Sequence, residues 1–359
     1  MKRGMLCVAA LAVASLSAVG ETVAVWDGDV SVEGGLGWRD NVLRSGVMNE
    51  DSAFMHSVVD ASAMRLSETD AFLMFYLLAD DIRYFDAPSV NYEQFLSLTA
   101  QGSIPVGVRD ELGLMLNYLY QHQIVDASAT EADLRRVLVL GHSLSARPYW
   151  KRLFPKSWAF KLEGVAVGQV FEHELDSYWE GGGAAALSKG YGNRSEVALL
   201  WESLVRHYDT REQLDLDGFA VPDTRLEYFQ NEVGAEWRHN WDAARTWRTL
   251  SRLGYLLSVD NGSGYFDYDR LVFRQRVQWR PDKWTFELNA RLSAYRHPNQ
   301  NVIDEERWRA AAVLEGRVER SLAKHLDAFA AAESEWSRSN DARDEYDAWM
   351  ASLGLALMF

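Results

Sequence analysis

The last residues of the chain, from Tyr346 to Phe359, constrain the fold more than any other stretch. Along them an alternating set of large apolar side chains (Trp349, Ala351, Leu353, Leu355, Leu357, Phe359) opposes a set of mostly small ones (Ala348, Met350, Ser352, Gly354, Ala356, Met358). Successive side chains of a strand point to opposite faces, so this stretch predicts a strand with one strongly apolar face. A membrane barrel turns such a face to lipid, whereas a soluble β-protein would bury it in a core or at an edge.

This ending resembles that of the outer-membrane β-barrel proteins of Gram-negative bacteria, whose last strand typically ends in Phe with apolar residues at every second position before it. The resemblance implies that Phe359, Leu357, Leu355 and Leu353 form the signal read by the barrel-assembly machinery. It extends to the barrel class over nearly the whole chain, and to no narrower family.

The N-terminal residues 1–20 are typical of a secretory signal peptide. A basic pair, Lys2 and Arg3, precedes an apolar run, and Ala18-Val19-Gly20 is a small-residue cleavage site. The predicted mature chain, 21–359, therefore contains no cysteine, because Cys7 is the only one.

The charge balance limits the partners. The chain has 37 basic and 52 acidic residues, and removing Lys2 and Arg3 leaves 35 against 52, a net charge of −17. Such acidity argues against nucleic acid, or an anionic lipid surface, as the main partner. No apolar run beyond the signal peptide reaches the roughly 18 residues of a helical span, so a membrane crossing requires a closed barrel.

Strand-length segments of alternating polarity fill the chain, about sixteen in all. The clearest is Trp247 to Val259, where Leu253, Tyr255 and Leu257 oppose Arg248 and Arg252. The segment Phe72 to Leu78 is apolar on both faces, so its orientation is open. We predict an all-β fold, a single antiparallel up-and-down transmembrane β-barrel of about sixteen strands. A soluble sandwich would also alternate, but about 340 residues would have to cover many apolar faces rich in Trp, Tyr and Phe.

The predicted connections alternate in length, as in bacterial barrels with short periplasmic turns and longer outer loops. Tight turns are expected at Ser67–Asp70, Phe154–Ser157, Trp241–Thr246 and Arg280–Lys283; longer loops are expected at Phe85–Asn91, Val125–Asp133, Asp209–Arg225, Asp260–Asp269 and His297–Glu306. An even strand number would place both termini in the periplasm.

The polar faces of the later strands carry many arginines, which would form one wall of the lumen. The candidates are Arg248, Arg252, Arg270, Arg274, Arg276, Arg280, Arg291, Arg307, Arg309 and Arg317, with the carboxylates Glu232, Glu236, Glu287, Glu315, Glu319, Glu333 and Glu335 on the same faces. Two interpretations stay open: a basic constriction facing an acidic wall, or cross-strand ion pairs that stiffen the barrel.

Other motifs carry weaker signals. Asp215, Asp217 and Asp223 lie in the longest loop, which could fold inward to meet the arginines or remain a solvated outer loop. Asp260 to Gly264 is typical of a turn and fits no calcium motif.

Enzyme chemistry has one candidate pair. The outer-membrane phospholipase family places His and Ser on one strand face, but His142 and Ser143 would point to opposite faces. We find no cofactor motif and no metal-ligand spacing.

The predicted function is passive, porin-like diffusion of small hydrophilic solutes through an arginine-lined lumen. The alternative is an accessory or structural barrel with a closed lumen, acting in export or assembly of a surface polymer or lipoprotein. The expected partners are outer-membrane lipid, the barrel-assembly machinery and small solutes, with a homo-oligomer possible and no nucleic acid. The chain is too short for a plugged barrel of about 22 strands.

Overall fold

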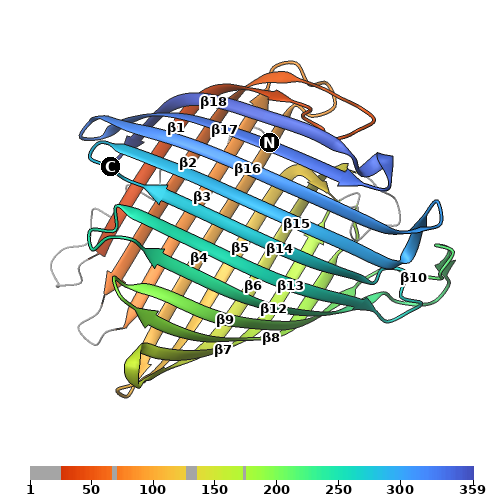
Figure 1. Ribbon diagram of the computed structural model, residues 1–359, viewed down its shortest axis with the longest axis horizontal. Coiled ribbons are helices and arrows are strands. Elements are labelled where there is room, and N and C mark those ends of the chain that lie inside the picture. Colours follow the sequence, from red (N-terminus) through yellow and green to blue (C-terminus); the bar gives the residue numbers. More distant parts are fainter. Residues whose placement is uncertain (1–25, 67–70, 127–135, 173–174) are drawn as a thin grey trace.

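The computed structural model describes residues 26–66, 71–126, 136–172 and 175–359. Its strands form one closed barrel of 16 antiparallel strands, which confirms the predicted fold class (Figure 1). The predicted signal peptide, residues 1–20, lies outside the described residues. The barrel strands are β1 (Trp26–Asp40), β2 (Ser52–Leu66), β3 (Phe72–Tyr84), β4 (Tyr92–Val106), β5 (Asp110–Asp126), β6 (Arg136–Phe154), β7 (Trp158–Phe171), β8 (Tyr178–Tyr191), β9 (Ser195–Tyr208), β12 (Glu227–Asn240), β13 (Trp247–Asp260), β14 (Tyr268–Trp279), β15 (Trp284–Val302), β16 (Glu305–Ala323), β17 (Leu326–Ser339) and β18 (Tyr346–Met358).

Three short elements lie in the connections. A small hairpin of β10 (Gln213–Leu214) and β11 (Ala220–Val221) interrupts the long loop between β9 and β12, and Figure 1 shows it beyond one end of the barrel. Two 3₁₀ turns, η1 (Pro155–Ser157) and η2 (Ala342–Asp344), occupy other connections. No helix in the described ranges is long and apolar enough to cross a membrane.

The C-terminal strand closes the barrel. β18 pairs with β17 on one side and with β1 on the other, where Leu353 lies opposite Leu36 and Leu357 opposite Val32. The side chain of Leu353 is 68% exposed, as expected for a residue that faces outward from the barrel. The alternating C-terminal stretch, Tyr346 to Phe359, therefore provides the strand that completes the ring.

Small residues at this seam leave space for an aromatic ring on the inner face. A Cβ atom at Gly35 would lie 2.8 Å from the carbonyl oxygen of Leu353 and 3.2 Å from the ring of Phe329. Phe329 is 4% exposed, and the guanidinium of Arg317 lies 4.2 Å from its ring centroid. Arg317 also pairs with Glu33 of β1 at 2.9 Å, so β16 is tied to the far side of the seam.

The outer wall is apolar and bordered by aromatic residues at both ends. Trp26 and Trp38 both face outward near opposite ends of β1, with 40% and 42% of their surfaces exposed. At about 3.3 Å per residue and a tilt of about 40°, they are about 30 Å apart along the axis, close to the thickness of a bilayer core. Outward tryptophans continue both belts: Trp158, Trp237, Trp247, Trp279 and Trp284 near Trp26, and Trp179, Trp308, Trp336 and Trp349 near Trp38.

The connections differ at the two ends, which we call the terminal end, where Trp26 and Phe359 lie, and the distal end opposite. Described terminal-end turns are short, for example 107–109, 192–194 and 280–283, whereas the distal loops 41–51, 85–91, 209–226 and 261–267 are longer. The predicted turn Ser67–Asp70 and most of the predicted loop Val125–Asp133 lie outside the described residues.

One predicted loop is wrong. Residues 297–306 were expected to leave the sheet, but β15 continues to Val302 and β16 begins at Glu305. A register shift between His297 and Asn301 absorbs the extra residues, and Ile303 and Asp304 make the turn with positive φ angles. A β-bulge can thus accommodate polar residues and a proline that suggest a loop in the sequence.

Candidate functional site

The inner face of β12 to β15 carries the densest group of charged side chains predicted from the sequence. On β13 the outward residues Leu253, Tyr255 and Leu257 are 42–48% exposed, so Arg252 and Leu256 between them point inward. The same alternation on β14 places Leu271 and Phe273 outside and Arg270, Arg274 and Arg276 inside.

Three arginines form a row across neighbouring strands. Arg252 of β13 lies directly opposite Arg274 of β14, and Arg274 lies directly opposite Arg291 of β15. Like charges in directly opposed cross-strand positions repel one another. Within the described part of the chain, no carboxylate pairs with Arg274 or Arg291. We call Arg252, Arg274 and Arg291 the arginine row.

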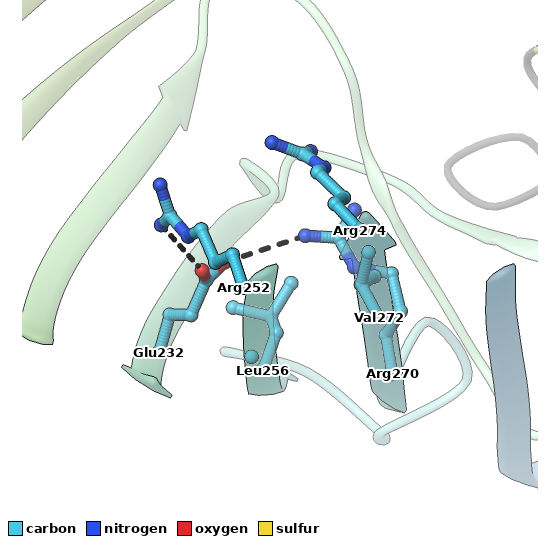
Figure 2. A pocket seen from close by; sticks show the side chains of 7 residues that line it. Glu232, Arg252, Leu256, Arg270, Val272 and Arg274 are labelled. Atoms are coloured by element: carbon cyan, nitrogen blue, oxygen red, sulfur yellow. Dashed lines mark hydrogen bonds and ion pairs between the residues drawn. The ribbon is translucent and has the colours of Figure 1, made fainter. Parts of the chain in front are cut away.

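A single carboxylate neutralises one side of the row. Glu232 Oε1 accepts a hydrogen bond from Arg252 Nη2 at 3.1 Å, and Glu232 Oε2 accepts one from Arg270 Nη2 at 3.4 Å (Figure 2). A Cβ atom at Gly254 would lie 3.0 Å from Glu232 Oε1, so the glycine leaves room for this carboxylate.

These residues border a small cavity of about 90 Å³, whose lining includes Leu256 and Val272. In Figure 2, both dashed contacts lead to Glu232, and the guanidinium of Arg274 lies apart from them. The site therefore contains the guanidinium of Arg274, which no described carboxylate neutralises, next to the apolar side chains of Leu256 and Val272.

Several of the other predicted arginines have carboxylate partners, and one of these pairs, Arg276 with Glu287, joins neighbouring strands. Arg276 pairs with Glu287 at 2.7 Å, and Arg317 pairs with Glu319 at 2.6 Å. Near the distal end, Arg307 pairs with the buried Asp344 at 2.7 Å.

The remaining candidates differ in their surroundings. Arg309 Nε donates to Ser337 Oγ at 2.8 Å, Arg248 Nε donates to the backbone oxygen of Arg245 at 3.1 Å, and Arg280 lies in the turn after β14. Three of the acidic candidates also have partners: Glu236 accepts from Arg238 at 3.1 Å, Glu315 accepts from Asn289 at 3.3 Å, and Glu335 pairs with Arg44 at 3.0 Å.

A wall with a different chemistry faces the arginine row. In a ring of 16 strands, β2 to β5 lie halfway round from β12 to β15. Asp60 accepts a hydrogen bond from Tyr76 at 2.8 Å, and Asp80 lies 3.1 Å from His56. Sequence reasoning missed Asp80 because β3 is apolar on both faces and its orientation was open, and it assigned no face to Asp60 of β2. The inward register of Tyr84 on the same strand, which bonds Arg39 at 2.7 Å, resolves that orientation.

Two apolar clusters join loop residues to the inner wall at the distal end. The first contains Val42 and Val90 from distal loops, packed with Phe54 and Tyr84 of the inner wall. A buried ionic contact lies beside it, where Arg39 Nη1 is 3.4 Å from Glu93 and Arg39 Nη2 is 3.6 Å from Glu333.

The second cluster anchors the longest loop. Leu226 and Phe266 are nearly fully buried against Tyr208 and Tyr228, with Leu214 of the hairpin packed on them. This contact brings the loop base to the inner wall.

The three predicted loop aspartates lie away from that base. Asp215 accepts hydrogen bonds from the backbone N–H groups of Asp217 and Phe219, so it stabilises the hairpin turn. Asp217 and Asp223 are exposed, and among the described residues none of the three aspartates contacts the arginine row. A role for them in passing solutes stays a prediction.

The His142 and Ser143 pair is separated as the strand alternation requires. His142 Nδ1 lies 2.8 Å from the hydroxyl of Tyr118 on the outer face, and Ser143 falls on the inner face of β6. No group of three or more potential metal-ligating side chains occurs within the described ranges.

A closed antiparallel barrel with an apolar outer wall between two aromatic belts defines the class of this molecule. The chain has the fold of an integral, membrane-spanning β-barrel like those of the outer membrane. No protein-family model matches it, and no curated protein matches it.

Among solved structures, the crystal structure of Acinetobacter baumannii OccAB1 is similar in fold. The TM-score is 0.50 at 8% sequence identity, over 93% of this chain and 97% of that chain. OccAB2 from the same organism gives 0.46 at 8% identity, over 93% and 98% of the two chains. The outer membrane protein opdK from Pseudomonas aeruginosa gives 0.45 at 9% identity, over 93% and 99%. At these identities the likeness concerns the fold alone.

Proposed function

We propose that the chain is an outer-membrane channel for passive diffusion of small hydrophilic solutes, and that its lumen favours anions. Barrels with this many strands usually enclose an aqueous path.

One observation carries the proposal: Arg274 lies between two other arginines on the inner face, and no described carboxylate pairs with it. Guanidinium groups stay charged at any working pH, so this repulsion persists in the empty channel. A passing anion lowers it, whereas a passing cation raises it. The acids of the opposite wall, Asp60 and Asp80, would add a transverse field in which dipolar solutes orient.

Planar-bilayer conductance of the refolded protein tests this function. We expect discrete open steps and a reversal potential of anion sign in a potassium chloride gradient. A bilayer that stays silent at high protein density would overturn the channel.

A second candidate function is an accessory or structural barrel with a closed lumen. The two apolar clusters at the distal end favour it, because loop residues pack there against the inner wall. Uptake of uncharged sugars into vesicles separates the two: a channel admits small sugars and excludes large ones, and a closed barrel admits none.

We also propose that both termini lie in the periplasm, since the short turns share their end of the barrel. Cysteine labelling can test this, because the only cysteine, Cys7, belongs to the predicted signal peptide. A membrane-impermeant maleimide should label Asp217→Cys on intact cells. The turn variant Asp282→Cys should react only after lysis, and the reverse pattern would invert the orientation.

A further inference from the structure

Three cations of the outer rim at the terminal end have no carboxylate partner among the described residues, whereas a fourth, Arg152, lies 3.8 Å from Asp110. Arg65, Lys189 and Arg320 face outward beside tryptophans of the terminal-end belt. The guanidinium of Arg320 lies 5.1 Å from the ring centroid of Trp284, and Lys189 Nζ lies 5.3 Å from that of Trp158.

Arg65 has the same arrangement with Trp26, at 6.0 Å. In the described residues, no carboxylate pairs with any of the three cations. Further exposed cations occupy the neighbouring turns, including Lys156, Arg194 and Lys283.

Outward cations at the distal end are neutralised by the protein itself. Arg338 makes two hydrogen bonds to the carboxylate of Asp347, at 2.7 and 3.0 Å. Arg296 makes two to Asp269, at 2.9 and 2.8 Å. The third pair is Arg83 with Asp81, at 2.8 Å.

This asymmetry is unexpected in a chain of net charge −15. An acidic protein has carboxylates available to pair with its cations, yet the terminal-end rim leaves Arg65, Lys189 and Arg320 without them. Whole-chain acidity argues against an anionic lipid surface only if the charges are evenly distributed, and here they are not.

We propose that the terminal-end rim binds the headgroups of anionic phospholipids in the adjacent leaflet. A tryptophan belt marks the level of the headgroups, so Arg65, Lys189 and Arg320 lie where lipid phosphates are found. A phosphate ester supplies the missing counter-charge and accepts hydrogen bonds from the cation. The aromatic ring beneath holds the cation at that level, which reduces the entropy lost on binding.

The distal rim would not share this preference for anionic lipid, because Asp81, Asp269 and Asp347 already pair with its outward arginines. The proposed binding therefore distinguishes the two leaflets. It is independent of conduction, because none of these side chains lies on the inner face.

Refolding of the full chain into vesicles tests the proposal. The probes are phosphatidylcholine vesicles and vesicles with about three tenths phosphatidylglycerol. We expect phosphatidylglycerol to raise the urea midpoint at low salt, and 1 M salt to abolish the increase, because headgroup attraction is screened.

Two triple variants make the test specific, because both change the net charge equally. Arg65→Gln with Lys189→Gln and Arg320→Gln should lose more than half of the phosphatidylglycerol-dependent increase, and should fold like the wild type in phosphatidylcholine. Arg83→Gln with Arg296→Gln and Arg338→Gln should keep the increase.

The proposal is overturned if the wild-type midpoint does not respond to phosphatidylglycerol, or if the two triple variants lose the response to the same extent. If the first variant fails to fold, the single variant Lys189→Gln replaces it. That variant should retain a reduced response, and a full response would count against the rim.

Discussion

Replacing Arg274 by glutamate should reverse the local sign of the arginine row. Arg274 has no carboxylate partner in the described residues, and its cross-strand neighbours are Arg252 and Arg291. A glutamate there would lie between two arginines, so the variant should fold at least as well as the wild type.

The expected size of the change follows from Coulomb's law. The interaction energy between one charge and an ion about 5 Å away is about 0.8 kcal/mol in water, and screening at 0.1 M salt reduces it to about 0.5 kcal/mol. An anion gains this energy and a cation loses it, so neutralising Arg274 should lower the anion-to-cation permeability ratio about fivefold. Charge reversal doubles the energy and gives a drop of roughly 25-fold; at 1 M salt the drop for neutralisation should shrink to less than about twofold.

Reversal potentials in planar bilayers measure this ratio directly. The variants are Arg274→Gln and Arg274→Glu, with Arg338→Glu as the control, because Arg338 carries the same charge on the outer face. A control that changes selectivity as much as Arg274→Glu would refute the reasoning, and so would an unchanged ratio in both Arg274 variants.

Three further predictions concern the seam and the distal loops. Gly35→Ala should destabilise the barrel by about 1–3 kcal/mol in urea unfolding, because its Cβ would crowd the β18 backbone, whereas Gly34→Ala meets open space and should be neutral. The hydrogen bonds from Arg343 lower the pKa of Asp341, so the stability that this loop carboxylate contributes is present above its unfolded pKa of about 3.9 and is lost as the pH falls through the lower folded pKa. Hydrogen exchange in the loop should therefore rise only below about pH 4, and Asp341→Asn should remove that change. Replacing residues 213–221 by a short glycine-serine linker should raise single-channel conductance, since Leu214 packs on the inner cluster; an unchanged conductance would show that the hairpin does not narrow the lumen.

The fold was predictable because the alternating pattern directly reflects the two environments of a barrel wall. Leu353 and Leu355 could be assigned to the outside from their spacing alone, and both are more than half exposed. The loop expected at residues 297–306 was wrong because a bulge is a matter of pairing geometry, which polar residues and a proline do not reveal.

The candidate site was predictable in composition but not in pairing. Alternation puts Arg252 and Arg274 on one face, whereas the sequence does not say that they lie directly opposite each other, because register depends on strand stagger. Asp80 was missed because β3 is apolar on both faces, and Asp60 because the sequence did not settle which face of β2 points inward. The sequence also does not reveal which arginine has a carboxylate partner. Glu232 of β12 reaches Arg252 of β13 and Arg270 of β14, so the pairing depends on the register of three neighbouring strands.

Acidic residues of the distal loops, among them Asp215, Asp217 and Asp223, lie well away from the arginine row along the barrel axis. We call them the distal acids, and their distance from the row predicts how selectivity depends on salt. From Arg252 to Asp260, along β13, the axial distance is about 20 Å at the usual strand rise and tilt. This exceeds the screening length of about 10 Å at 0.1 M, so at that salt the acids of the distal loops do not act on ions beside the row. At 0.01 M the screening length is about 30 Å, and the acidic distal loops should then cancel part of the potential of the row. Anion selectivity should therefore rise as salt falls from 1 M to 0.1 M and decline again near 0.01 M. A ratio that keeps rising at the lowest salt would show that the distal acids do not act on the row.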